Sequence, residues 1–329
     1  MQFRAILLSA LTLITVGGSP LDPAMAADAA KDYPNRPIRM LVPNAPGSSV
    51  DTLGRIFAHA LTQVSGQQVV VDNRAGAGGI LGMEIGKNAS PDGYTVISAS
   101  TAAMVIGPHI HKKLPFDPLK DYEFISLFGI TPNILVVNPT LPVKSVKELV
   151  DYARSRQGQI NMASAGPGAQ SHLAGVLLMK LGNFQSLHVP YKGGGASVAA
   201  VVAGESQWTI TPAPAVAGLI QSGKLRAIGH SLEKRDPLLG DLPAVAETIK
   251  GFEYSGWNGL LAPAGTPRPI LAKLHALVLK TVATPDVRQG FAKQLTQVTT
   301  NTPEAFRKFV AKEIQEMGPI VKEAGLKVE

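Results

Sequence analysis

The sequence has 329 residues, a formal net charge of +7 and no cysteine. A chain of this length predicts two domains or one large α/β domain, and the absence of cysteine excludes a disulfide framework. The basic residues are scattered and form no stripe interleaved with aromatic residues, which argues against nucleic-acid binding. A modest positive field would still attract small anions.

The N-terminus has the pattern of a secretory signal peptide. Arg4 precedes an apolar run from Ala5 to Val16, and Ala24-Met25-Ala26 fits the small-x-small cleavage rule. We therefore predict a signal peptide over residues 1–26, cleavage after Ala26 and export of the mature chain. The alternative is an uncleaved anchor, but the run is shorter than the roughly 18 residues that a membrane span needs.

Short strands and helices alternate along the rest of the chain. The predicted strands are Ile38–Val42, Gln68–Val71, Thr95–Ala99, Phe124–Phe128, Ile134–Val137, Ile160–Ala163, Leu187–Val189, Trp208–Thr211 and Leu225–Ile228. The predicted helices are Val50–Val64, Gly78–Lys87, Val146–Arg156, Gln170–Leu181, Ser197–Val202, Ala215–Gln221 and a long tail helix with apolar residues from Phe306 to Val321. This alternation predicts βα units and largely parallel sheets.

Two segments could cross between two halves of the chain. Gly129–Asn133 lies between two apolar strands, and Gly251–Asn258 precedes another apolar run. If both cross, the first lobe consists of residues 33–130 and 256–329, and the second lobe of residues 131–255. Two crossings of this kind form a hinge that can close on a ligand.

Four strand-to-helix turns are rich in small residues and carry almost no charge. They are Pro46–Ser49, Ser98–Ala102, Ser164–Ser171 and Lys192–Ser197. In α/β sheets such turns gather where ligands bind, and each exposes backbone N–H groups at the positive end of a helix. They could hold a carboxylate without arginine or lysine, although small residues also serve simply as tight turns. Asp51 follows the first turn, and we expect it to cap the helix rather than touch an anion.

Catalytic and cofactor motifs are weak or absent. Asn73–Gly82 imitates a dinucleotide fingerprint, but the next strand ends in Ser98–Thr101 rather than in the acid that would bind a ribose. There is no G-x-S-x-G or H-E-x-x-H sequence, and His109-x-His111 has no third metal ligand nearby in the sequence. His172 and His188 are expected to be structural. We therefore expect no catalytic residues, no cofactor and no metal.

At these motifs the chain resembles the periplasmic solute-binding proteins of the tripartite tricarboxylate transporters, the Bug family. The matching residues are Pro43-x-x-Pro46-Gly47 with Asp51 and Arg55, Asn73-Arg74-x-Gly76-Ala77-Gly78-Gly79, Pro91–Thr95, Gly166-x-Gly168 with Ser171–Leu173, His188–Gly193, Gly223–Ala227, Gly256-Trp257-x-Gly259 and Ala262-Pro263-x-Gly265-Thr266-Pro267. Together they cover essentially the whole mature chain.

The resemblance implies a type II periplasmic binding fold, or Venus flytrap, with two α/β lobes and a two-crossover hinge. It implies a monomer, not an enzyme, that captures a small organic acid in the periplasm for a membrane permease. A mono-, di- or tricarboxylate, an amino acid and an aromatic acid all stay open. The implied ligand-binding residues are Asn44, Pro46, Gly47, Ser48, Ser49, Ser100, Thr101, Ser164, Gly166, Gly168, Ala169, Gln170, Tyr191 and Ala213.

Two residues depart from the family pattern. The family usually has an aromatic residue where Asn44 stands and a second glycine where Ser48 stands. Both changes favour a more polar ligand. The rival hypotheses are an exported α/β enzyme, a hydrolase or an oxidoreductase, and a ligand sensor that has no permease.

Overall fold

The structure is a computed structural model that describes residues 31–156 and 158–326. The predicted signal peptide and its cleavage site lie outside the described residues. No helix in the described part of the chain is both long enough and apolar enough to cross a membrane.

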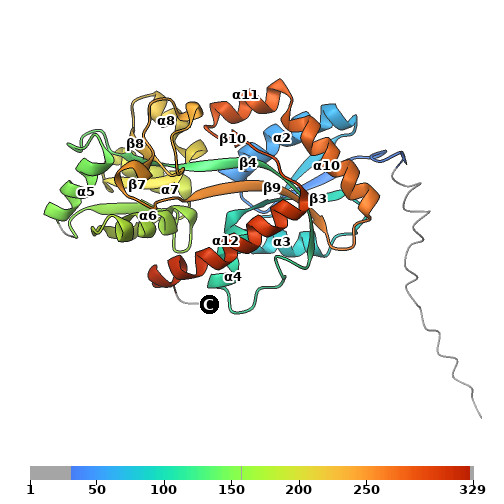
Figure 1. The fold of residues 1–329 in the computed structure, drawn as a ribbon, viewed down its shortest axis with the longest axis horizontal. Coiled ribbons are helices and arrows are strands. Elements are labelled where there is room, and N and C mark those ends of the chain that lie inside the picture. Colours follow the sequence, from blue (N-terminus) through green and yellow to red (C-terminus); the bar gives the residue numbers. More distant parts are fainter. Residues whose placement is uncertain (1–30, 157, 327–329) are drawn as a thin grey trace, which may run out of the picture.

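A ten-stranded mixed sheet runs the length of the molecule (Figure 1). In spatial order its main path is β2 (Val69–Asn73), β1 (Ile38–Val42), β3 (Thr95–Ser100), β9 (Ser255–Pro263), β4 (Tyr122–Val137), β7 (Trp208–Pro212), β5 (Asn161–Ser164) and β6 (Leu187–Pro190). Two further strands, β8 (Arg226–His230) and β10 (Gln297–Val298), also pair with β4.

Strand direction changes along the sheet. Pairing is parallel at the two ends, among β1, β2 and β3 and among β5, β6 and β7. Pairing is antiparallel in the middle, where β3, β9, β4, β7, β8 and β10 meet. The prediction of largely parallel sheets therefore holds at each end and is wrong at the centre, because strands that carry the chain between the two ends must run in both directions.

Strands β4 and β9 form the connection between the two ends of the sheet (Figure 1). They pair from Tyr122 opposite Pro263 to Pro132 opposite Ser255. The two strands predicted at Phe124–Phe128 and Ile134–Val137 are one continuous strand, since Gly129–Asn133 remains extended and paired. Both predicted crossings thus overlap this strand pair. The lobe boundaries given above stay a prediction.

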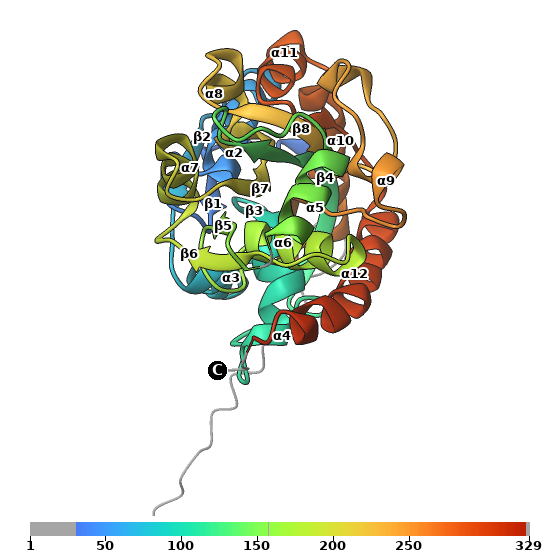
Figure 2. The ribbon, with the colours of Figure 1, turned by 90° about the vertical axis from the view of Figure 1, so that its left-hand side faces the viewer.

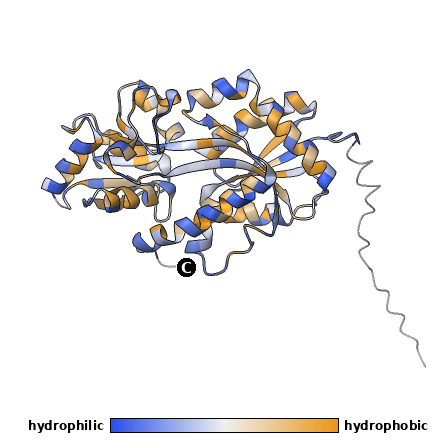
Figure 3. Ribbon diagram, viewed as in Figure 1, coloured by the Kyte–Doolittle hydropathy of each residue, from blue (hydrophilic) through white to orange (hydrophobic). Residues whose placement is uncertain are grey.

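Helices cover the sheet on both sides (Figure 2). They are α2 (Ser49–Ser65), α3 (Ile80–Lys87), α4 (Gly107–Ile110), α5 (Val146–Ser155), α6 (Gln170–Leu181), α7 (Gly194–Ala203), α8 (Ala217–Gln221), α9 (Val245–Thr248), α10 (Arg268–Val282), α11 (Pro285–Lys293) and α12 (Pro303–Glu323). Hydrophobic and hydrophilic residues alternate around them (Figure 3), because one face packs on the sheet and the other meets solvent.

The core is continuous through the strand pair. One cluster of buried side chains extends from Leu41 on β1 and Ile97 on β3 to Trp208 on β7 and Leu173 on α6. A second cluster, around the stacked rings of Phe57 and Phe128, supports the first lobe, and a smaller one supports the second. The sheet therefore gives both sets of predicted ligand turns a rigid base.

Candidate functional site

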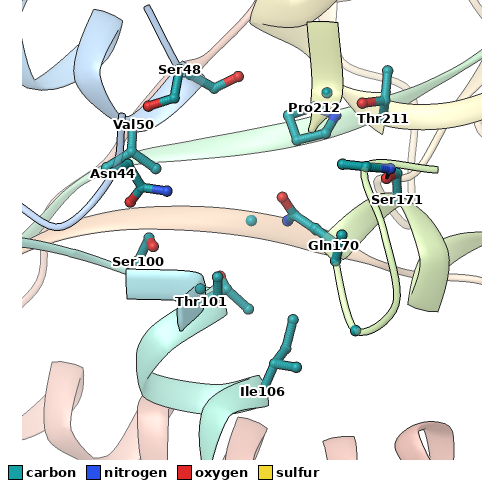
Figure 4. Close-up of a pocket in the computed structure, with 18 of the residues that line it drawn as sticks. Asn44, Ser48, Val50, Ser100, Thr101, Ile106, Gln170, Ser171, Thr211 and Pro212 are labelled. Atoms are coloured by element: carbon teal, nitrogen blue, oxygen red, sulfur yellow. Dashed lines mark hydrogen bonds between the residues drawn. The ribbon is translucent and has the colours of Figure 1, made fainter. Parts of the chain in front are cut away.

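A cavity of about 1070 Å³ opens where the predicted ligand turns of the two lobes face each other (Figure 4). All four turns contribute to its wall. Ser48 and Ser49 come from the turn before α2, and Ser100 to Ala102 follow β3. From the second lobe come the turn ending at Gln170 and the Gly194-Gly195 pair that begins α7. The structure confirms that these four turns converge.

Most of the predicted ligand-binding residues line this cavity. They are Asn44, Gly47, Ser48, Ser49, Ser100, Thr101, Gly168, Ala169 and Gln170. In Figure 4 the side chains of Asn44 and Gln170 extend toward each other across the open space from opposite lobes. Contact of these residues with a ligand remains a prediction.

Five of the predicted residues do not line the cavity: Pro46, Ser164, Gly166, Tyr191 and Ala213. Ser164 and Ala213 are fully buried. Pro46 is an exposed residue of the first turn, and the hydroxyl of Tyr191 lies 3.2 Å from Ser206 Oγ. Residues next to each other in the sequence thus differ in role: some side chains face the cavity, and their neighbours support the turn. The sequence alone did not distinguish the two groups.

Other wall residues were not predicted. Thr131 on β4 and Gly256, Trp257 and Asn258 on β9 form the part of the wall that belongs to the crossing strands. The sequence does carry a signal for them, because all four lie in the two segments predicted to cross between the lobes. A strand pair that joins two lobes is exposed to the space between those lobes. The Ala77-Gly78 pair, first weighed as a nucleotide motif, also lines the cavity.

Asp51 explains why the first turn holds its shape. Its carboxylate, 2% exposed, accepts hydrogen bonds from the Gly47 backbone N–H at 2.8 Å, from Arg55 Nε at 3.0 Å and from Asn73 Nδ2 at 2.8 Å. Burial alone would raise the pKa of this carboxyl, but the bonds from Arg55, Gly47 and Asn73 outweigh it and lower the pKa. The Asp51 carboxylate therefore braces the turn. The helix cap expected of it is provided instead by the Ser48 hydroxyl.

Two stacked histidines support the turn between β5 and α6. The rings of His172 and His188 lie 3.9 Å apart, and the backbone N–H of Gly168 donates to His172 Nδ1 at 3.2 Å. Burial lowers the pKa of both imidazoles, and the neighbouring His188 lowers that of His172 further, to about 4. Both rings are therefore neutral at pH 7, in keeping with the structural assignment made from the sequence.

The pair formed by Ser164 and His188 resembles a nucleophile and its base. Ser164 Oγ lies 2.6 Å from His188 Nε2. Ser164 is nevertheless completely buried and outside the cavity wall, so a substrate in the cavity has no path to its hydroxyl. The hydrogen bond instead holds the loop, because the backbone N–H of Gly166 also donates to Ser164 Oγ.

The cavity wall carries almost no charge. None of its described residues is Asp, Glu, Lys or Arg, and the one titratable side chain among them is that of His111. Helices α2, α6 and α7 each begin at the wall, and their first N–H groups give it a positive potential. Within residues 31–156 and 158–326, no group of three His, Cys, Asp or Glu side chains could hold a metal. The arrangement can bind an anion through dipoles and hydroxyl groups.

Comparisons with known proteins agree with this arrangement. Residues 53–326 match the profile of the tripartite tricarboxylate transporter family receptors. BugT of Bordetella pertussis is 34% identical over 303 residues, which are 92% of this chain and 93% of that protein.

Two solved structures share the fold and carry a ligand. An R. palustris protein solved with adipate is 28% identical, with a TM-score of 0.83 over 90% of this chain and 99% of that one. MatC of Rhodopseudomonas palustris, solved with bound malate, is 30% identical, with a TM-score of 0.77 over 88% of this chain and 100% of that one.

Proposed function

Because this chain belongs to the tripartite tricarboxylate transporter receptor family, we propose that it captures a small organic carboxylate in the cavity described above. The observation that carries this proposal is the uncharged wall built from helix N-termini of both lobes. Such a wall stabilises an anion by aligned N–H dipoles and leaves no carboxylate to repel it.

The adipate and malate of the two structural neighbours support the same ligand class. We assign the protein to the periplasm after cleavage at Ala26, with delivery of the ligand to a membrane permease. No enzyme activity is assigned, since the one Ser–His pair described above is sealed from the cavity. A sensor that lacks a permease would use the same cavity, and binding assays do not separate the two roles.

A panel of acetate, benzoate, malate, adipate and citrate tests the proposal. The fully methylated ester of each acid is its uncharged control. Differential scanning calorimetry of thermal unfolding measures how much each compound stabilises the protein. A ligand present at a hundredfold excess over its Kd should stabilise the protein by about 2.7 kcal/mol, and the esters should bind much more weakly. Equal binding of acid and ester, or binding of no acid, would refute the proposal.

Gln170 and Gln221 provide a matched pair of variants. Gln170 lies on the wall with its amide against Gly256, and Gln221 is exposed at the end of α8. Gln170→Ala should raise the Kd of the bound acid about two- to tenfold, the value of one hydrogen bond. Gln221→Ala should leave it unchanged. A Kd that changes in Gln221→Ala and not in Gln170→Ala would exclude Gln170 from the site.

A further inference from the structure

A continuous set of contacts links helix α12 to the cavity wall through Trp257. The indole N–H of Trp257 donates to the carboxylate of Glu313 on α12. The backbone N–H of Trp257 donates to Thr101 Oγ1 at 3.1 Å, and both Trp257 and Thr101 line the cavity. Trp257 thus stands between the Glu313 carboxylate and the space that a ligand would occupy.

The contact with Trp257 fixes how the Thr101 hydroxyl can act. Because Thr101 Oγ1 already accepts a hydrogen bond, its own proton is available to an acceptor in the cavity. Trp257 itself is 2% exposed and is held edge-on by Phe306 and Phe309 of α12, with ring centroids 5.3 and 6.3 Å away. The enclosed Trp257 side chain therefore holds Glu313 and Thr101 at fixed positions relative to each other.

Glu313 is poised to change its charge under ordinary conditions. Burial raises the pKa of this carboxyl to about 7, although the bond from Trp257 opposes the rise. Glu316 on α12 and Glu253 before β9 raise it further, and Lys312 lowers it.

The other groups near Glu313 do not offset its charge. Burial raises the pKa of Tyr254, and the charge of Glu313 raises it further, while the Tyr254 hydroxyl donates to Met317 Sδ. From α4, His109 Nε2 lies 2.6 Å from the backbone carbonyl of Ile314 and not from a carboxylate. Behind Trp257, the described side chains therefore place no cation in contact with Glu313.

We propose that Glu313 is a positioning residue for the ligand site and that binding of the anionic ligand is coupled to partial proton uptake, the proton passing from solvent to Glu313. This inference rests on the proposed function. A carboxylate in the cavity and an ionised Glu313 repel each other across Trp257, so ligand binding favours the protonated form of Glu313. By linkage, protonation of Glu313 strengthens ligand binding to the same extent.

The size of the effect follows from the separation across an indole ring. A unit charge about 10 Å away, in an effective dielectric of about 20, changes an anion's affinity by about tenfold. Affinity should therefore be constant below about pH 7, fall about tenfold as Glu313 ionises above that pH, and then level off. Ligand binding is therefore tighter at acidic pH than at alkaline pH.

Calorimetry in phosphate and in Tris at pH 7.5 measures proton uptake directly, because the two buffers differ in ionisation enthalpy. The probe is whichever acid of the panel above gives the lowest Kd, and the Kd is also measured from pH 6.5 to 8.5. We expect uptake of a substantial fraction of one proton per ligand. No uptake by the unmodified protein would overturn the proposal, even though carboxylate binding itself would stand.

Three variants assign the proton. Glu313→Gln keeps an oxygen for the Trp257 indole but cannot titrate, so its affinity should lose the pH dependence and match the acid limit of the unmodified protein. Glu316→Gln, on the exposed side of α12, and His111→Gln, at the cavity wall, should keep the pH dependence. Persistence of the slope in Glu313→Gln, or its loss in His111→Gln, would overturn the assignment. If Glu313→Gln fails to fold, the two-buffer measurement is made on His111→Gln: uptake that persists there supports Glu313, and its loss would overturn the assignment.

Discussion

Replacing Ser48 with alanine should weaken both the folded state and ligand binding, because its hydroxyl can act in two ways. Ser48 Oγ caps α2 by accepting a hydrogen bond from the Asp51 backbone N–H at 3.2 Å. Loss of an N-cap of this kind costs about 1 kcal/mol of stability. The hydroxyl proton is not used in that bond and lies at the cavity wall. If it donates to a ligand, its loss should cost about 0.5–1.5 kcal/mol of binding, or about two- to tenfold in Kd.

Two controls separate these effects. Ser145 caps α5 with the same geometry, 3.2 Å to the Glu148 N–H, but lies outside the cavity. Ser145→Ala should therefore lose similar stability in urea unfolding and leave the calorimetric Kd unchanged. Ser48→Gly should keep most of the capping energy and lose affinity. An unchanged Kd in both Ser48 variants would show that the hydroxyl does not touch the ligand.

Three other substitutions, with Gly223→Ala as a control for one of them, test the support of the cavity. Asp51→Asn should lower the free energy of unfolding by about 1.5–3 kcal/mol, the range for bonds to a charged group; an unchanged urea midpoint would contradict this. Gly168→Ala should lower the free energy of unfolding by about 1–2 kcal/mol, because the φ of Gly168 is +72°. It should also weaken ligand binding, since the new Cβ would lie 3.1 Å from Cδ1 of Ile110, a residue of the cavity wall. Gly223 has a φ of +70° and open space around it, so Gly223→Ala should lose stability through backbone strain and leave the Kd unchanged. Equal changes in Kd for the Gly168 and Gly223 variants would contradict this. Because burial holds the pKa of His172 at about 4, the unfolded chain binds a proton below about pH 6.5 that the folded chain does not. Stability should therefore be full above pH 6.5 and fall by about 2–3 kcal/mol toward pH 4, and urea titrations of His172→Asn should show that loss reduced.

Local sequence patterns predicted most of the elements that carry the site. Helix α6 begins and ends where its periodicity indicates, and β1 does too. Each has strong local cues, an apolar repeat or a run of branched residues between turn residues. Ser145, Thr284 and Thr302 cap their helices, as expected for a Ser or Thr just before a helical pattern, whereas Thr266 before Pro267 does not cap α10.

Pairing direction and wall composition could not be predicted in this way. Whether Gly129–Asn133 breaks a strand or continues it depends on pairing with β9, more than 120 residues away in the sequence. The same long-range pairing brings Thr131 and Asn258 together at the cavity wall. Ser164 was expected to bind the ligand from the resemblance to the family, but it is fully buried and its hydroxyl pairs with His188 instead. Local propensity fixes where a turn occurs, and packing decides which of its side chains faces the ligand.

The most direct test of the binding mode is a titration of the ¹⁵N-labelled protein with the tightest-binding acid, followed by backbone amide resonances. Binding by helix N-termini predicts the largest shifts at Ser49 and Val50 in one lobe and at Gln170 and Ser171 in the other, with both groups saturating at one Kd. Shifts confined to one lobe, or centred on lysine and arginine side chains outside the cavity, would contradict it.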